Sequence, residues 1–278
     1  MPAVDVAAGT IEYEDSGGSG PPVVMLHGLI MDGSLWRNVV DQLSGEYRCI
    51  LPTLPLGAHR QPMRPEADLS MGGIARILGE FLEKLDLREV TLVMSDWGGP
   101  QLLIGGEWDH RLAKLVICNC EAFDNVPPQG AARALPYVAR IPGGITMALT
   151  PFRCDALRRL PMTYGPLSKR PVPRQIMDRW FMPPLKQRTV RRDLRKYILS
   201  SHRGRRELLA ASDLFSRFDR PVLVVWASED SLMPREHGQR LAELFPNGKL
   251  IEVDDSYTLI PEDQPDLLAD QMLEFLRS

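Results

Sequence analysis

The chain has 278 residues, 44% of them hydrophobic, and a formal net charge of −3 at pH 7. A chain of this size buries one large core, or a core with a smaller cap. The small negative charge gives no bulk affinity for nucleic acid or for an anionic membrane, so neither is expected as a partner. No apolar run approaches the ~20 residues of a membrane-spanning helix.

The N-terminal residues and the cysteines favour a cytoplasmic protein. Residues 1–10, MPAVDVAAGT, lack the basic and apolar parts of a secretory signal. The four cysteines have no metal-ligand spacing, and Cys118 and Cys120 lie two apart on an expected strand, as packed thiols do. We therefore expect a cytoplasmic location and no metal or other cofactor.

Strands and helices alternate through the first 120 residues. A hairpin is predicted for residues 4–7 and 10–14, and further strands for residues 23–26, 47–51, 90–93 and 115–120. Helical spacing predicts three helices, one from Trp36 to Leu43 with Ser34 as N-cap, one capped by Ser70, and one over residues 98–107. This alternation is typical of a parallel, doubly wound α/β sheet.

The alternation breaks between about residues 125 and 212, where prolines are frequent and helical patterns are short. It returns with strands at 222–226 and 250–253 and helices at 236–244 and 267–276. A helical insertion at this point is typical of a lid over the sheet edge where ligands bind. We predict an α/β core of residues 1–124 and 213–278 with a helical cap of residues 125–212.

Residues 90–99, VTLVMSDWGG, predict a strand that turns sharply into a helix. Such an elbow places one side chain at its apex, beside a helix N-terminus. The bent backbone needs small residues two positions before and after the apex. Asp96 has Gly98 on one side, whereas Ser95 would have Val93 and Trp97, so Asp96 is the better candidate.

These features resemble the α/β-hydrolase superfamily, nearest to its haloalkane dehalogenase and epoxide hydrolase branch. The resemblance covers nearly the whole chain and rests on four motifs: His27-Gly28 after a strand, DWGG at the elbow, Ser228-Glu229-Asp230 after residues 222–226, and the C-terminal DDSYTLIPEDQPDLL. It implies an α/β-hydrolase fold with a mostly parallel eight-stranded sheet, helices on both faces and a helical cap.

The resemblance also implies catalytic roles. In that branch an aspartate attacks carbon to form an alkyl ester, a histidine activates water to hydrolyse it, and a second acid orients the histidine. Asp96 matches the nucleophile and Asp230 the orienting acid, while the backbone N–H groups of Leu29 and Trp97 match the oxyanion hole. The histidine position reads Tyr257. Since about one phenol in a thousand is ionised at pH 7, an Asp96 ester is expected to persist.

Further residues are candidates for binding substrate. His59, in the Pro-rich loop after residues 47–51, is the histidine expected to face the pocket, and His27 is expected to brace its loop. Glu121 follows the strand 115–120, where one dehalogenase subgroup keeps its acid. The other candidates are Trp36, Trp180 and the cap tyrosines Tyr137, Tyr164 and Tyr197. Leu29 stands where dehalogenases keep a halide-binding asparagine.

The cap carries a separate charge signal. Between Arg153 and Arg206 there are 16 Lys or Arg residues and 3 Asp residues, a net charge of +13, so that the rest of the chain carries −16. This asymmetry would steer an anionic substrate, dock the lid on an acidic core surface, or simply form the solvated face of amphipathic helices.

Three functions are open at this point. The first is an enzyme that uses Asp96 on an ester, epoxide or carbon–halide bond of a small, mostly apolar substrate, with Tyr257 in the triad and a reaction that need not be hydrolytic. The second is a hydrolase with a relocated base such as His59, or one inactivated at position 257. The third is a ligand-binding member without catalysis. Burying Asp96 and Asp230 without use would be costly, which weighs against the third. A homodimer is left open.

Overall fold

The computed structural model describes all 278 residues and contains one eight-stranded sheet in the order β1-β2-β4-β3-β5-β6-β7-β8. β1 and β2 and also β2 and β4 are antiparallel, and the other pairs are parallel. The sheet confirms the predicted fold class. Its strands are β1 (Ala3–Val6), β2 (Gly9–Asp15), β3 (Pro22–Met25), β4 (Arg48–Pro52), β5 (Val90–Asp96), β6 (Leu112–Cys120), β7 (Val222–Ala227) and β8 (Gly248–Val253).

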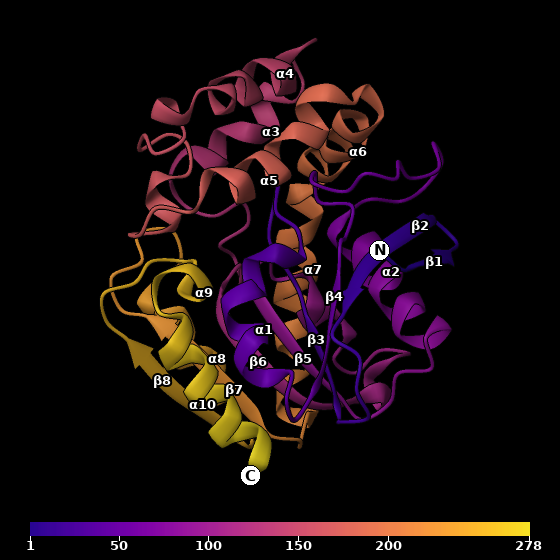
Figure 1. Cartoon of the computed structure of the whole chain (residues 1–278), viewed down its shortest axis with the longest axis vertical. Coiled ribbons are helices and arrows are strands. Elements are labelled where there is room, and N and C mark those ends of the chain that lie inside the picture. Colours follow the sequence, from indigo (N-terminus) through magenta and orange to yellow (C-terminus); the bar gives the residue numbers. More distant parts are fainter.

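Helices cover both faces of this sheet (Figure 1). On one face, α1 (Arg37–Leu43), α9 (Ile260–Asp263) and α10 (Pro265–Arg277) pack together. On the other, α2 (Met71–Lys84) packs with α7 (Ser201–Ser212), and α8 (Arg235–Leu244) lies against β7 and β8. One continuous hydrophobic core joins these layers.

Of the two predicted N-caps, one is confirmed and one is wrong. The Ser70 hydroxyl accepts a hydrogen bond from Gly73 N at 3.1 Å, which confirms Ser70 as the N-cap of α2. Ser34 is not the cap of the first helical segment. Asp32 fills that role by accepting from Ser34 N at 3.0 Å, and a 3₁₀ turn, η1 (Gly33–Trp36), precedes α1. A carboxylate there also complements the helix dipole.

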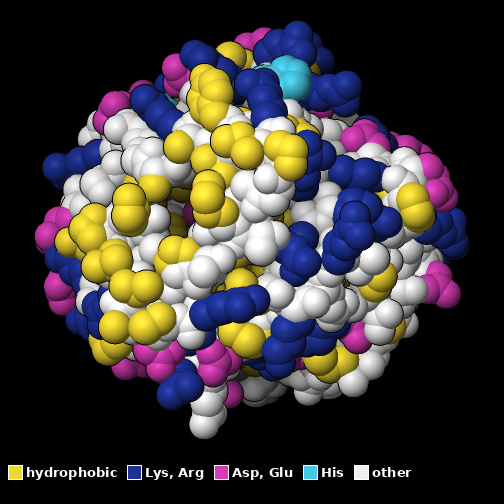
Figure 2. Space-filling model, turned by 90° about the horizontal axis from the view of Figure 1, so that it is seen from above, with side chains coloured by type: hydrophobic (Ala, Val, Ile, Leu, Met, Phe, Trp, Pro, Cys, Tyr) yellow, Lys and Arg dark blue, Asp and Glu magenta, His cyan; other side chains and the backbone are white.

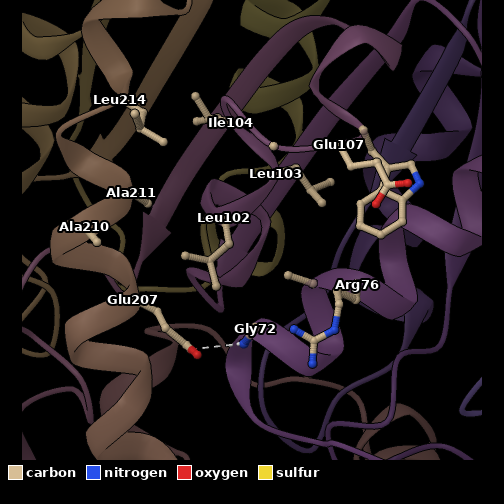
Figure 3. A pocket seen from close by; sticks show the side chains of 13 residues that line it. Gly72, Arg76, Leu102, Leu103, Ile104, Glu107, Glu207, Ala210, Ala211 and Leu214 are labelled. Atoms are coloured by element: carbon tan, nitrogen blue, oxygen red, sulfur yellow. Dashed lines mark hydrogen bonds between the residues drawn. The ribbon is translucent and has the colours of Figure 1, made fainter.

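The helix predicted over residues 98–107 is wrong in length. The structure has only a 3₁₀ helix, η2 (Gly99–Leu103), because the backbone becomes extended at Ile104, and the left-handed φ of 70° at Gly105 then turns the chain away. A groove of about 380 Å³ remains between η2, α2 and α7. Figure 3 shows its apolar wall and, across it, the hydrogen bond from Gly72 N to Glu207. Helix α7 therefore packs on the core, although its residues fall inside the predicted cap range.

The remaining insertion lies above the sheet as a layer of short helices (Figure 1). Prolines are frequent before residue 168, where every helical segment is short, since proline removes a backbone donor, but residues 174–186 form a 13-residue helix that contains Pro183 and Pro184. These elements are η4 (Gly130–Ala134), α3 (Leu135–Val138), α4 (Gly144–Leu149), η5 (Thr150–Arg153), η6 (Asp155–Leu157), η7 (Gly165–Leu167), α5 (Arg174–Lys186) and α6 (Arg188–Leu199). Two short 3₁₀ turns lie outside the cap, η3 (Asp109–Arg111) and η8 (Phe215–Arg217).

A buried carboxylate ties this cap to the core. Asp32 accepts hydrogen bonds from Arg179 and Trp180 of α5 and from Arg60 of the core. Burial alone would raise the pKa of Asp32, but the charge of Arg179 and the donors of Ser34 outweigh burial, and the pKa is lowered. The carboxylate is thus held ionised among its cations.

Removal of this carboxylate is expected to destabilise the protein strongly. Asp32→Ala takes the carboxylate acceptor from Arg179 Nε and one of the two acceptors from Trp180 Nε1, at a cost of about 3–5 kcal/mol in the free energy of unfolding. Urea unfolding measures the loss, and Asp270→Ala on the exposed face of α10 serves as the control, with a change within about 0.5 kcal/mol. A loss of unfolding free energy below about 1 kcal/mol for Asp32→Ala would contradict the role of Asp32 in holding the cap on the core.

Candidate active site

The structure places Asp96 at the apex of the turn after β5. Its φ of 63° is a left-handed conformation that costs a non-glycine residue about 1–3 kcal/mol and is typical of functional turns. The turn aims the carboxylate at the loop after β3, where Leu29 N donates a hydrogen bond to Asp96 Oδ2 at 3.0 Å. A Cβ at Gly28 would lie 1.9 Å from the same oxygen, so glycine is required there.

The second expected oxyanion donor is engaged elsewhere. Trp97 N donates to Ser95 O at 2.7 Å, because the left-handed turn at Asp96 folds the backbone back on itself. The prediction of two free backbone donors is therefore wrong for this conformation, in which Leu29 alone faces the carboxylate. The turn also approaches β6 closely, since a Cβ at Gly98 would lie 2.1 Å from Glu121 O.

The orienting acid is present, and its partner is a threonine. Asp230 Oδ2 accepts 2.8 Å hydrogen bonds from Asn119 Nδ2 and from Thr258 Oγ1. The negative charge of Asp230 contributes to raising the pKa of Asp96, so the two carboxylates lie in one electrostatic environment. The family pattern places a base in contact with this acid. In this chain the contact is made by the hydroxyl of Thr258.

Tyr257 does not occupy the place predicted for it. Its backbone N–H donates to Asp263 Oδ2 at 3.0 Å, and its ring lies 5.3 Å from Lys169 Nζ, an amine paired with the exposed carboxylate of Glu229. The ring does not line the cavity described below. The sequence register was wrong by one residue, because the hydrogen bonds to Asp263 hold residue 257 outward and turn residue 258 toward Asp230.

A mostly apolar cavity of about 740 Å³ lies over the elbow and is walled largely by the cap. Its only carboxyl groups are those of Asp96 and Glu121, and no histidine, lysine or arginine lines it. The cap contributes two phenols, Tyr164 and Tyr197. Apolar walls with a few convergent polar groups are typical of a site for a small organic molecule.

The two carboxyl groups have unequal proton affinities. Burial, with a contribution from Asp230, raises the pKa of Asp96 to about 6, whereas burial together with the charge of Asp96 raises the pKa of Glu121 to about 8. Near pH 7 Asp96 is mostly ionised and Glu121 is mostly protonated. Carboxyls with pKa values pushed to opposite sides of neutrality supply one base and one acid.

Hydroxyl donors complete the polar part of the cavity. Tyr197 Oη lies 3.4 Å from Glu121 Oε2, and the buried hydroxyl of Tyr164 has no hydrogen-bond partner. The indole N–H of Trp97 is also buried without a partner. The site therefore offers one anionic oxygen of Asp96 surrounded by several groups that can donate a proton or a hydrogen bond.

The two candidate histidines lie outside the cavity, contrary to their assignment as substrate contacts. His27 Nε2 accepts from Leu54 N at 2.9 Å, so His27 braces its loop. His59 Nε2 lies 3.4 Å from the buried carboxylate of Asp193, and its other ring nitrogen accepts from Gly57 N. Both rings are held by contacts with the backbone or with Asp193 of the cap, so neither is free to activate water in the cavity.

Three aromatic candidates are also corrected. Trp36 is a core residue whose Nε1 donates to Leu26 O at 3.0 Å, and Trp180 is a core residue whose Nε1 donates to Asp32 and Ser34. Tyr137 is 68% exposed and does not line the cavity. Tyr164 and Glu121 do line it. Thr258 was missed, because nothing in its residue type marks it before the loop register is known.

Burial of the Asp96 carboxylate is expected to cost stability. Its folded pKa lies above the unfolded value of about 3.9, so the penalty is absent below about pH 4 and complete above about pH 6. Asp96→Asn should therefore be more stable than the natural chain by about 1–3 kcal/mol at pH 8 and by less at pH 4, as measured by urea unfolding. Asp270→Asn is the matched exposed control. A less stable Asp96→Asn at pH 8 would contradict a desolvated carboxylate.

Comparison with known proteins identifies the family of the chain. Residues 21–265 match the family described as alpha/beta hydrolase fold. Haloalkane dehalogenase 2 of Mycobacterium tuberculosis is 25% identical over 284 residues, covering 97% of this chain and 92% of that protein. The cis-3-alkyl-4-alkyloxetan-2-one decarboxylase of Xanthomonas campestris is 28% identical over 300 residues, covering 98% and 94%.

Solved structures are similar over the whole chain. A thermophilic esterase from Thermogutta terrifontis has a TM-score of 0.73 and 22% identity, covering 100% of this chain and 98% of that one. An alpha/beta hydrolase fold protein from Burkholderia ambifaria has a TM-score of 0.77 and 24% identity, covering 98% and 97%. These structures share the fold of the chain, and the family match over residues 21–265 shows that the chain belongs to the α/β-hydrolase fold family.

Proposed function

We propose that the chain is a haloalkane dehalogenase-like enzyme of this family in which the Asp96 carboxylate attacks a carbon atom of a small, mostly apolar substrate. The turn supports this role, because Leu29 N holds one oxygen of Asp96 and leaves the other for the substrate. The apolar lining of the cavity fits a substrate with little charge. The raised pKa of Asp96, about 6, still leaves it mostly ionised at pH 7.

The donors around Asp96 favour an oxygen leaving group. A departing alkoxide or carboxylate gains from the hydroxyl of Tyr164 and from the protonated Glu121 with Tyr197. Leu29 replaces the asparagine of a halide site, so a carbon–halide bond is a poorer fit. We therefore favour a carbon–oxygen bond in an epoxide or a lactone.

One observation favours chemistry without water over hydrolysis, namely the hydrogen bond from the hydroxyl of Thr258 to Asp230. Water attack on an Asp96 ester needs a general base, which contributes roughly 10²–10⁴-fold. Thr258 is no base at pH 7, no histidine lines the cavity, and Glu121 is mostly protonated. A reaction that releases Asp96 without water fits this set of groups best.

A four-membered lactone meets that requirement, and two relatives are named as decarboxylases of such oxetan-2-ones. Asp96 attacks the alkyl-bearing ring carbon next to the ring oxygen, the bond between these two atoms breaks, and the oxygen leaves as part of a carboxylate. The carbon–carbon bond to that carboxylate then breaks and its electron pair forms the alkene, while the bond to Asp96 breaks. The products are an alkene and CO₂, the Asp96 carboxylate returns, and no water or redox partner is consumed.

The two other functions are less well supported. A hydrolase with His59 as base would need that ring in the cavity, whereas it contacts Asp193. A ligand-binding protein without catalysis would use the cavity but would not need the turn at Asp96, whose strained φ of 63° costs stability.

Product analysis tests the proposal with three substrates of equal chain length: a cis-3,4-dialkyl-oxetan-2-one, a terminal epoxide and a 1-bromoalkane. We expect alkene and CO₂ from the oxetanone as the fastest reaction. Asp96→Asn should lower that rate at least about 10³-fold, since the nucleophile is lost. Tyr257→Phe is the control and should keep the natural rate, because its ring lies outside the cavity. Faster release of bromide or diol, or tight binding without turnover, would contradict the proposal.

Restoring a base should introduce hydrolysis. Thr258→His places an imidazole beside Asp230, and we expect diol formation from the epoxide to rise about 10²-fold. Tyr257→His is the matched variant one residue away and should give no gain. The assignment of position 258 fails if Tyr257→His produces the larger increase.

A further inference from the structure

The outer face of the cap over residues 130–163, here called the outer cap surface, exposes most of the large hydrophobic side chains that the protein leaves in solvent. Six of the nine such residues lie in this stretch: Tyr137, Ile141, Met147, Leu157, Leu160 and Met162, with exposed fractions from 39% to 73%. Figure 2, which views the cap from above, shows hydrophobic side chains gathered there with Lys and Arg beside them. A concentrated apolar surface of this kind marks an interaction site.

The same stretch is cationic. It contains five arginines and one acidic residue, Asp155, which pairs with Arg158 and Arg174. The other four arginines have no ion-pair partner: Arg133, Arg140, Arg153 and Arg159. The guanidinium of Arg140 lies 5.6 Å from the ring centre of Tyr137, so cationic and apolar groups are interleaved.

The outer cap surface is also the outside of the cavity wall. Twenty of the 30 residues that line the cavity come from positions 127–167. Met162 lines the cavity and is 73% exposed to solvent. A single thin layer of short helices therefore separates the apolar exterior from the apolar interior.

The positive charge of the outer cap surface argues against a second copy of the chain as its binding partner. A second copy placed with its outer cap surface against this one would bring together two surfaces of net charge +4 each, from five arginines and one aspartate, which repel one another. Apolar side chains mixed with unpaired arginines match a bilayer interface, where the former enter the acyl boundary and the latter contact lipid phosphates. No helix is long and apolar enough to cross a membrane, so such contact would be peripheral.

We propose that the outer cap surface docks on an anionic lipid surface. The whole-chain charge of −3 is the sum of +13 between Arg153 and Arg206 and −16 in the rest of the chain. An anionic surface therefore attracts the cap and repels the core. The docked cap turns its cavity wall toward the lipid, and an apolar substrate then enters beside Met162. This delivery step rests on the proposed function, whereas docking does not.

Vesicle co-sedimentation without substrate tests docking separately from catalysis. Phosphatidylcholine vesicles with 30 mol% phosphatidylglycerol are compared with pure phosphatidylcholine vesicles. We expect binding to the anionic vesicles that is at least about 10-fold tighter, and that weakens at least about 10-fold between 0.05 and 0.5 M salt as the charges are screened. Asp96→Asn should bind as the natural chain does.

Surface variants locate the contact. Arg133→Gln, Arg140→Gln and Arg153→Gln together should weaken binding to anionic vesicles by roughly 100-fold. Tyr137→Ser, Ile141→Ser and Met147→Ser together should weaken it at least about 10-fold while leaving the salt dependence in place. Lys249→Gln and Leu267→Ser, exposed on the core, are the matched controls and should bind normally.

Three results would overturn the proposal: equal binding to both kinds of vesicle, no binding to either, or core controls that weaken binding as much as the cap variants. Concentration-dependent self-association of the natural chain without vesicle binding would also overturn it, because a second copy would then cover the surface.

Discussion

The structure depends on the close approach between the backbone turn at Asp96 and the loop that follows β3. That approach is possible because Gly28 has no Cβ in the path of the carboxylate, and because Asp96 accepts a left-handed φ of 63°. The strain is offset by the hydrogen bond from Leu29 and by the parallel strands on either side. It converts the end of a buried strand into an anionic group that faces a mostly apolar cavity.

The cap determines what that anion can do. It supplies the apolar walls that raise the pKa of Asp96 and Glu121, and the phenols that offer protons to a leaving oxygen. It is tied to the core through Asp32, whose carboxylate collects donors from both parts. The electrostatic properties of the site thus arise from the packing of cap on core, since neither part alone would desolvate the two carboxyls.

Much of this arrangement can be predicted from the sequence, because it follows from local patterns. Strand periodicity, the Ser70 cap and the spacing around Asp96 identify the sheet, α2 and the elbow. The rest depends on side-chain contacts and backbone conformations that residue patterns do not specify. Asp193 contacts His59 from 134 residues away in the sequence and removes it from the site. Asp263, six residues after Tyr257, sets the register that exchanges Tyr257 for Thr258, and the extended backbone of Ile104 ends the helix after the elbow.

The central claim is that Asp96 forms and releases a covalent bond to substrate without attack by water, since Thr258 stands where a base would be. Isotope incorporation tests it most directly. The enzyme is turned over with a cis-3,4-dialkyl-oxetan-2-one in H₂¹⁸O, and the peptide containing Asp96 is then examined by mass spectrometry. The account predicts alkene formation with no ¹⁸O above background in the Asp96 carboxylate. Incorporation of ¹⁸O at Asp96 in step with turnover would show ester hydrolysis and contradict it.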